Sequence, residues 1–342
     1  MQQTRGVSPA SACQPRLQSV AVRHNWPSGA RRQWRIQSSD LDEIDPMTGE
    51  VIEGTARART ASNTVSTGRF THAYRGSADS NASLPVVCAH GVGSSSYSFR
   101  KTVNLLEKDG VQAMAFDFLG HGASDHPSSS EFSYTQHAYI SELQKLMETL
   151  YGDTPVVLIT HGYILGQYAM LYAARNPDRI AKLVTLNVPL GLKSKLRPEL
   201  AQYKSPIPFL KPKQNSPFDG RFYNAAGGPY ALAATDADAY NAPYEQSPNN
   251  ASAAIWHTME NCDWEALKKQ VDEEFASFQK PTLLIHGNSD SFLDVKGTLD
   301  WLEEKRTNMK MCYGIEAKLG HMPQEDYPEA IHPVILEYIT ST

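Results

Sequence analysis

Cysteine is scarce in this sequence, and long apolar runs are missing from it altogether. The four cysteines are scattered along 342 residues, as Cys13, Cys88, Cys262 and Cys312. They form no CxxC pair and no His/Cys metal spacing, so we predict reduced thiols and no metal site, in preference to a disulfide framework. No apolar run reaches the length of a membrane-spanning helix, and we therefore expect no transmembrane segment. The net charge of −5 gives no general attraction to nucleic acid.

Acidic residues and lysines are absent from residues 1–39, which hold six arginines and six serines. Such composition is typical of organelle transit peptides, so we predict a transit peptide over 1–39 and a chloroplast or plastid location. The alternative is a plain disordered tail, because a charged segment with few large apolar residues cannot build a core. A secretory signal is disfavoured, since no apolar h-region is present.

The remainder of the chain is acidic and carries a net charge of −11 without residues 1–39. Six of its acidic residues lie within residues 40–53, and we assign 40–65 to an acidic N-terminal linker. This balance offers no basic cluster for an anionic lipid surface. We therefore expect a neutral, largely apolar small-molecule ligand, or a protein complex as partner, and no cofactor.

Strand-like and helix-like segments alternate over residues 66–190 and again over 280–342. A first strand or one arm of a hairpin is expected at 66–74. Further strands are expected at 84–89, 111–116, 156–160, 183–188, 281–285 and 310–315, and helices at 98–108, 139–150, 165–176, 299–306 and 330–339. This alternation predicts an α/β fold with a doubly wound, mostly parallel sheet and helices on both faces. The Pro- and Tyr-rich stretch 191–279 breaks the rhythm, and we predict an inserted cap there, with helices over 251–262 and 264–278.

A nucleophile is missing where the pattern demands one. The strand at 156–160 runs into the helix at 165–176, which is the layout of a nucleophile elbow, where Ser, Cys or Asp sits on a strained turn. Between Thr154 and Pro177 the chain has no Ser, Cys, Asp or Glu. Counting from the strand puts Gly162 in the vacant position. Counting back from Pro177 puts Tyr163 there, but its phenol is mostly protonated near neutral pH.

We prefer Gly162 and infer a one-residue insertion in the following helix. Glycine also adopts elbow geometry without the strain of roughly 1–3 kcal/mol that such sites impose on other residues. The bulky Ile164 stands where a small residue would let helix and strand approach closely.

Other parts of a catalytic site are present. His321 lies in a Gly-His-x-Pro turn, and Asp290 follows the strand at 281–285, so the pair could form a proton-transfer dyad. Asp294 is the competing carboxylate, and a structural loop histidine is the competing interpretation of His321. The glycine-rich run after His90 could aim backbone amides at an anion.

We assign the oxyanion-hole amides to Val92 and Tyr163, and we expect His90, Gly91, Tyr163 and Trp256 to line the pocket. For the cap aromatics, Trp256 included, ordinary core packing is the alternative.

These motifs resemble the α/β-hydrolase superfamily. The series is a strand ending in His-Gly, D-x-x-G-H-G-x-S-D at 117–125, the elbow, a cap, P-T-L-L-I-H-G-x-x-D at 281–290 and G-H-x-P-Q-E-x-x-P-E at 320–329. The order of nucleophile, Asp and His agrees with that fold. The chain is also similar to plastid-targeted hydrolase-like proteins, and to the chlorophyll-dephytylase and epoxide-hydrolase/haloalkane-dehalogenase branches in residues 96–100 and 176–179.

The resemblance implies an α/β-hydrolase-fold protein without ordinary hydrolase activity. Those enzyme branches require Ser or Asp where Gly162 stands, so their activities do not carry over. We expect ligand binding or a role as an assembly subunit in a plastid. Two alternatives stay open: a cofactor-free enzyme that uses the His321–Asp290 dyad as general base, and a hydrolase with a displaced nucleophile.

Overall fold

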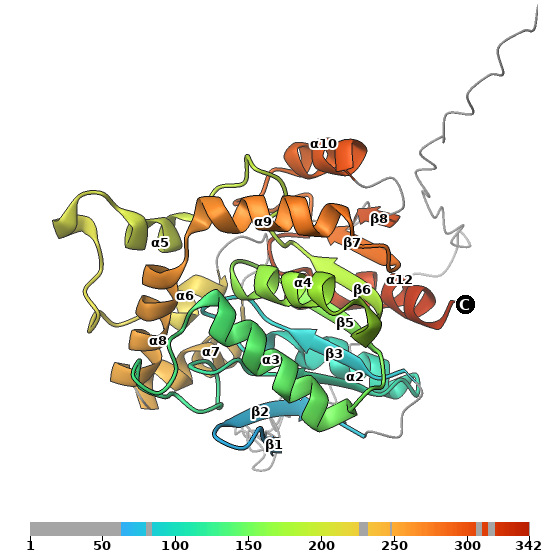
Figure 1. Ribbon diagram of the computed structural model, residues 1–342, viewed down its shortest axis with the longest axis horizontal. Helices are drawn as coiled ribbons and strands as arrows, with labels where there is room; N and C mark the ends of the chain where they lie inside the picture. The colour runs from blue at the N-terminus through green and yellow to red at the C-terminus, as the bar shows by residue number, and fades with distance from the viewer. Residues whose placement is uncertain are drawn as a thin grey trace, which may run out of the picture. The chain divides into compact units, whose positions relative to one another are not determined.

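The computed structural model describes residues 63–79, 84–225, 232–246, 248–305, 310–313 and 319–341. The predicted transit peptide over 1–39 lies outside the described residues and stays a prediction. Of the predicted linker over 40–65, residues 40–62 also lie outside them, and residues 63–65 belong to the first strand. The described residues centre on a mixed sheet of eight strands in the order β1-β2-β4-β3-β5-β6-β7-β8 (Figure 1).

The strands from β4 to β8 in this order run parallel, and β1 and β2 pair antiparallel at one edge. The strands are β1 (Asn63–Ser66), β2 (Thr71–Gly76), β3 (Val86–Ala89), β4 (Ala113–Phe116), β5 (Val156–His161), β6 (Ile180–Leu186), β7 (Thr282–His286) and β8 (Lys310–Tyr313). The predicted doubly wound, mostly parallel sheet is confirmed.

Helices cover both faces of the sheet (Figure 1). One face is covered by α2 (Arg100–Lys108) and α12 (Pro328–Thr340), and the other by α3 (Gln136–Tyr151), α4 (Leu165–Arg175), α9 (Trp264–Ala276) and α10 (Val295–Lys305). The side chains of β3 alternate between the two cores: Val86 and Cys88 pack with α2 and α12, and Val87 and Ala89 with the other helices. This alternation explains why the strand reads as one continuous apolar run.

The stretch between β6 and β7 is largely helical. It contains α5 (Pro198–Ala201), η3 (Gln202–Lys204), η4 (Pro208–Leu210), α6 (Gly220–Ala225), α7 (Ala234–Gln246), α8 (Pro248–Asn261) and α9. The helices predicted at 251–262 and 264–278 correspond to α8 and α9. Helix α7 was not predicted, because Pro243 lies inside it and its apolar residues follow no helical period. The predicted limits of the cap, 191 and 279, stay predictions.

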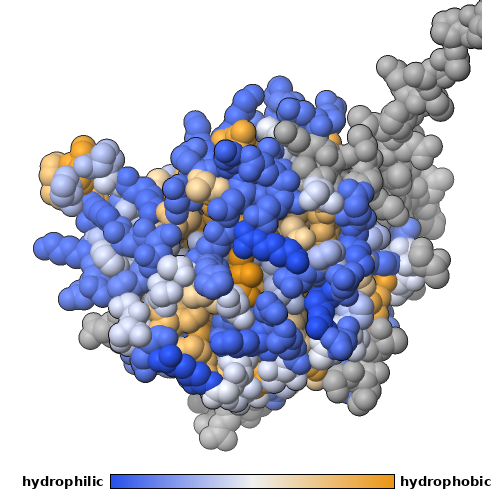
Figure 2. Space-filling view, viewed as in Figure 1, coloured by the Kyte–Doolittle hydropathy of each residue, from blue (hydrophilic) through white to orange (hydrophobic). Residues whose placement is uncertain are grey.

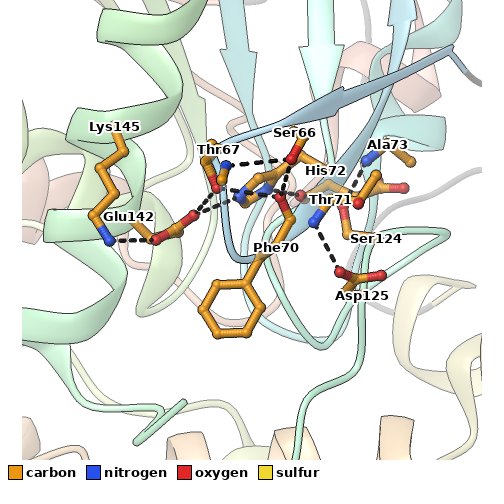
Figure 3. A network of polar contacts seen from close by, with 12 residues as sticks. Ser66, Thr67, Phe70, Thr71, His72, Ala73, Ser124, Asp125, Glu142 and Lys145 are labelled. Atoms are coloured by element: carbon orange, nitrogen blue, oxygen red, sulfur yellow. Dashed lines mark hydrogen bonds and ion pairs between the residues drawn. The ribbon is translucent and has the colours of Figure 1, made fainter. Parts of the chain in front are cut away.

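A buried polar network attaches the edge hairpin to α3 (Figure 3). Glu142 of α3 contacts His72 Nε2 at 3.3 Å and also accepts a hydrogen bond from Thr67. Burial raises the pKa of Glu142, but the hydrogen bonds of His72, Thr67 and Lys145 outweigh it and bring the pKa to about 2. The carboxylate therefore stays charged, and its partners fix β1 and β2 against the helix.

Candidate active site

The elbow between β5 and α4 is a three-residue turn of Gly162, Tyr163 and Ile164. Gly162 has φ 77° and Ile164 has φ 61°. A β-branched residue at positive φ is a backbone outlier, so the expected relief of strain is incomplete. An unfavourable conformation therefore falls on Ile164. The Ile164 N–H donates to Gln167 Oε1 at 3.1 Å, which holds this residue in place.

Helix and strand do approach closely, but at a different residue from the one expected. A Cβ on Gly166 would lie 2.3 Å from the carbonyl oxygen of His161, closer than any side chain allows. Thr160 Oγ1 also donates to the carbonyl oxygen of Gly166 at 2.9 Å. Gly166 therefore permits the close approach of helix and strand that was expected at position 164, two residues earlier in the chain.

Gly162 faces the imidazole of His321. An added Cβ on Gly162 would lie 3.4 Å from Gly91 Cα and 4.0 Å from His321 Nε2. Gly91 itself lies directly against the elbow, since its own added Cβ would be 3.1 Å from the Tyr163 nitrogen. The structure thus brings Gly91, Gly162 and His321 together, and a side chain at position 162 would point at the histidine.

His321 and Asp290 form a hydrogen-bonded pair, with Nδ1 2.8 Å from Asp290 Oδ2. Asp290 also accepts from Asn187 Nδ2 at 2.7 Å and from the amides of Phe292 and Leu293. Burial raises the pKa of Asp290, but His321 and these donors outweigh burial and hold it below its usual value. The competing Asp294 instead accepts backbone amides at the start of α10.

Neighbouring groups fix the loop that carries His321. The Gly320 N–H donates to Asp326 Oδ2 at 2.6 Å, and His161 Nε2 lies 2.9 Å from the His321 carbonyl oxygen. Burial, with a smaller contribution from His321, lowers the pKa of His161 to about 3. His161 is therefore neutral and donates to this carbonyl, which makes it a structural neighbour of the dyad.

The predicted oxyanion-hole amide of Val92 is already engaged. Its N–H donates to the carbonyl oxygen of Tyr163 at 3.0 Å. An oxyanion hole needs donors free to meet a developing charge, and this donor meets the chain's own carbonyl. The Tyr163 side chain offers no nucleophile either, because burial raises the pKa of its phenol far above the usual range.

The space beside the dyad is almost filled. The cavity has a volume of about 10 Å³, which is room for roughly one water molecule. It is lined by Gly91, Val92, Ser94, His161, Gly162, Tyr163, Arg197, Tyr223, Asn224, His321 and Met322. Three of these residues, Ser94, Tyr163 and Asn224, have a buried side-chain oxygen without a hydrogen-bond partner among the described residues.

Arg197 lines the cavity beside His321, and no sequence signal predicted this place for it. Its side chain is 1% exposed, and Nε lies 2.9 Å from Glu199 Oε2. The guanidinium stacks 3.8 Å from the Tyr223 ring centroid and 4.2 Å from that of Phe292. In the sequence Arg197 looks like one more cation in a lysine-rich stretch, so only the fold identifies it.

Two residues predicted for the pocket do not line this cavity. Both ring nitrogens of His90 bond the backbone, Nδ1 at the Gly91 carbonyl oxygen and Nε2 at the Phe118 amide. Trp256 Nε1 donates to the Pro212 carbonyl oxygen at 3.1 Å. The tryptophan that packs against the elbow is Trp264, 6.0 Å from the Tyr163 ring. Among the described residues, no cluster of His, Cys, Asp or Glu could hold a metal ion.

Comparison with known proteins supports the reading of these motifs. A family model described as alpha/beta hydrolase fold matches residues 85–328. The chain is 40% identical over 103 residues to cis-3-alkyl-4-alkyloxetan-2-one decarboxylase of Shewanella oneidensis. This alignment covers 30% of this chain and 32% of that protein. It is 33% identical over 102 residues to putative methylesterase 15, chloroplastic, of Arabidopsis thaliana, covering 30% of this chain and 22% of that protein. The match thus spans less than a third of either relative.

Solved structures resemble the chain over a longer range. A loop variant of the haloalkane dehalogenase DbeA from Bradyrhizobium elkanii superposes with a TM-score of 0.64 at 18% identity. The alignment covers 82% of this chain and 96% of that one. At this identity the likeness establishes the fold alone.

Proposed function

Because this chain belongs to the α/β-hydrolase fold family, we propose that it has lost nucleophilic hydrolysis and acts as an assembly or binding protein in a plastid. The observation that carries the proposal is Gly162. Hydrolases of this fold attack from a Ser, Cys or Asp side chain at the elbow. Here the elbow presents a glycine to an intact His321–Asp290 pair.

The rest of the site supports the same proposal. The Val92 amide is bonded to Tyr163, and the cavity of about 10 Å³ is far smaller than the several hundred Å³ of a typical ligand site. A filled cavity favours assembly over small-molecule binding at this place. The plastid part rests on the arginine-rich, acid-free composition of residues 1–39 and is a separate claim.

The test of the proposal combines chemical labelling with recovery of the native protein. The purified chain is treated with a fluorophosphonate probe beside an active serine hydrolase as control, and no adduct is expected. The native protein is then isolated from its organelle, and its mature N-terminus, bound proteins and bound small molecules are identified together. Stoichiometric labelling within 154–177 would refute the loss of the nucleophile, and retention of Met1 would refute the plastid import.

A second function is favoured by one observation, the preserved dyad. His321 Nε2 faces the cavity while Nδ1 is held by Asp290, so the imidazole could act as a general base without a covalent step. The relative named as a decarboxylase supports chemistry other than simple hydrolysis in this family. A substrate whose turnover disappears in His321→Ala but survives in Tyr163→Phe would favour this enzyme over the assembly protein.

A further inference from the structure

The segment between β6 and α6 carries an apolar tip. It protrudes at the left of Figure 1 beyond α5, and Figure 2 shows apolar side chains at that tip above a hydrophilic surface. Phe209 is 85% exposed, Leu210 55% and Ile207 42%. Single exposed apolar residues are common on protein surfaces, but three within four consecutive residues at a protruding tip form a patch.

The same segment concentrates positive charge. This segment, residues 187–219, contains six basic residues and two acids, a net charge of +4 in a chain whose overall charge is −5. Lys193, Lys195, Lys204 and Lys213 are exposed. Lys211 is partly buried and pairs with Glu260 at 2.5 Å. The net charge led us to expect no basic cluster for an anionic lipid surface, but an average over the chain conceals this segment.

A groove continues the apolar surface from the tip toward the dyad. It has a volume of about 530 Å³. Its lining includes the apolar Phe209, Leu210 and Phe222, the basic Lys211 and Lys213, and the acidic Glu199 and Asp219. Phe222 is itself 63% exposed. Tyr223 lines both this groove and the cavity beside His321.

We propose that the tip, residues 207–210, together with the exposed Lys204 and Lys213 on either side of it, is a contact surface for an anionic lipid bilayer. Aromatic and aliphatic side chains insert at the boundary between headgroups and acyl chains, and lysines beside them are attracted to anionic headgroups. A convex, protruding tip suits insertion into a bilayer, whereas a protein partner needs a broader complementary surface. None of the helices in the described ranges is long and apolar enough to cross a membrane.

The experiment is co-sedimentation of the full chain with vesicles. Phosphatidylcholine vesicles are compared with vesicles that also contain phosphatidylglycerol, at low and high salt. We expect binding only to the anionic vesicles, weakened by salt. The double variant Phe209→Ser/Leu210→Ser should lose binding. Lys204→Glu/Lys213→Glu should weaken it at least about tenfold, because each lysine contributes to attraction by the surface.

Matched control variants distinguish binding through this surface from nonspecific adsorption to vesicles. Tyr327→Ser removes an exposed apolar residue elsewhere, and Lys296→Glu reverses an exposed charge on α10. Both should bind anionic vesicles like the wild type, and circular dichroism checks that every variant is folded. Equal sedimentation of tip and control variants, or no sedimentation of the wild type, would overturn the proposal. So would self-association that requires Phe209 in the absence of lipid.

Discussion

At the scale of single residues, the site differs from a working hydrolase at one position and in its surroundings. Gly162 lacks the reactive atom, yet an added Cβ there has ordinary contacts and lies 4.0 Å from His321 Nε2. Space for a side chain therefore remains at the elbow. What is missing besides the nucleophile is a free amide at Val92 and room for a substrate. A hydroxyl alone should accordingly not restore catalysis.

Substitution of Gly162 tests this view. Gly162→Ser and Gly162→Ala should each destabilise the protein by about 1–2 kcal/mol, because φ of 77° disfavours any residue with a Cβ. Neither should hydrolyse p-nitrophenyl esters or react with a fluorophosphonate. Urea unfolding and ester hydrolysis measure both effects, and the alanine variant controls for strain without the hydroxyl. Ester turnover by the serine variant above that of the alanine variant would mean that the oxyanion site and pocket still function.

The hydroxyl of Tyr163 provides a second test at this scale. It is buried without a hydrogen-bond partner among the described residues, whereas the Tyr139 hydroxyl lies 2.9 Å from Thr258 Oγ1. Removal of an unsatisfied polar group costs little or stabilises, and removal of a satisfied one costs about 1 kcal/mol. Tyr163→Phe should therefore leave the free energy of unfolding unchanged or raise it, and Tyr139→Phe should lower it. Equal losses would reveal a partner for Tyr163, such as a water molecule in the cavity.

At the scale of elements, the sequence predicted the parts whose signal is local. Apolar runs such as Val86–Ala89 are buried on both faces, and apolar residues recur at helical spacing in helices such as α3. The positions of these strands and helices could therefore be assigned from the sequence. The His321–Asp290 pair was placed because His321 lies in a Gly-His-x-Pro turn, Asp290 follows a predicted strand by a short loop, and their order along the chain agrees with this fold. Arg197 and α7 carry no such pattern. Their roles come from tertiary packing, which residue types alone do not specify.

The contact between β5 and α4 gives a prediction for an element. Gly166→Ala should destabilise by about 1–3 kcal/mol, because its Cβ would meet the His161 carbonyl at 2.3 Å and force the helix away from the strand. Gly297→Ala, in α10, is the matched control. Its nearest atom would be 3.7 Å away, so the substitution should stabilise the helix by about 0.5–1 kcal/mol. Chemical denaturation compares the two, and a stable Gly166→Ala protein would show that α4 can move without cost.

At the scale of the whole molecule, buried histidines make folding depend on pH. His90, His121, His161 and His286 are at most 2% exposed. Burial lowers the pKa of all four, that of His161 to about 3. In the unfolded chain they titrate near pH 6.5. Below that pH the unfolded state binds more protons than the folded state, so stability falls as pH falls. Asp326 opposes this trend, because burial raises its pKa to about 6 and the folded state takes up a proton there.

The histidines should outweigh Asp326, and the free energy of unfolding should drop by at least about 3 kcal/mol between pH 7 and pH 5. Urea unfolding across this range measures the loss. His121→Asn should reduce the slope by about one proton, or 1.4 kcal/mol per pH unit. The His121 imidazole is buried in the folded protein and takes up its proton only on unfolding, whereas asparagine takes up none. His137→Asn replaces an exposed histidine on α3 and should leave the slope unchanged. If stability were flat from pH 7 to pH 5, or if both variants behaved alike, the buried histidines would have to accept protons within the folded protein, and the closed packing around the dyad would have to open in acid.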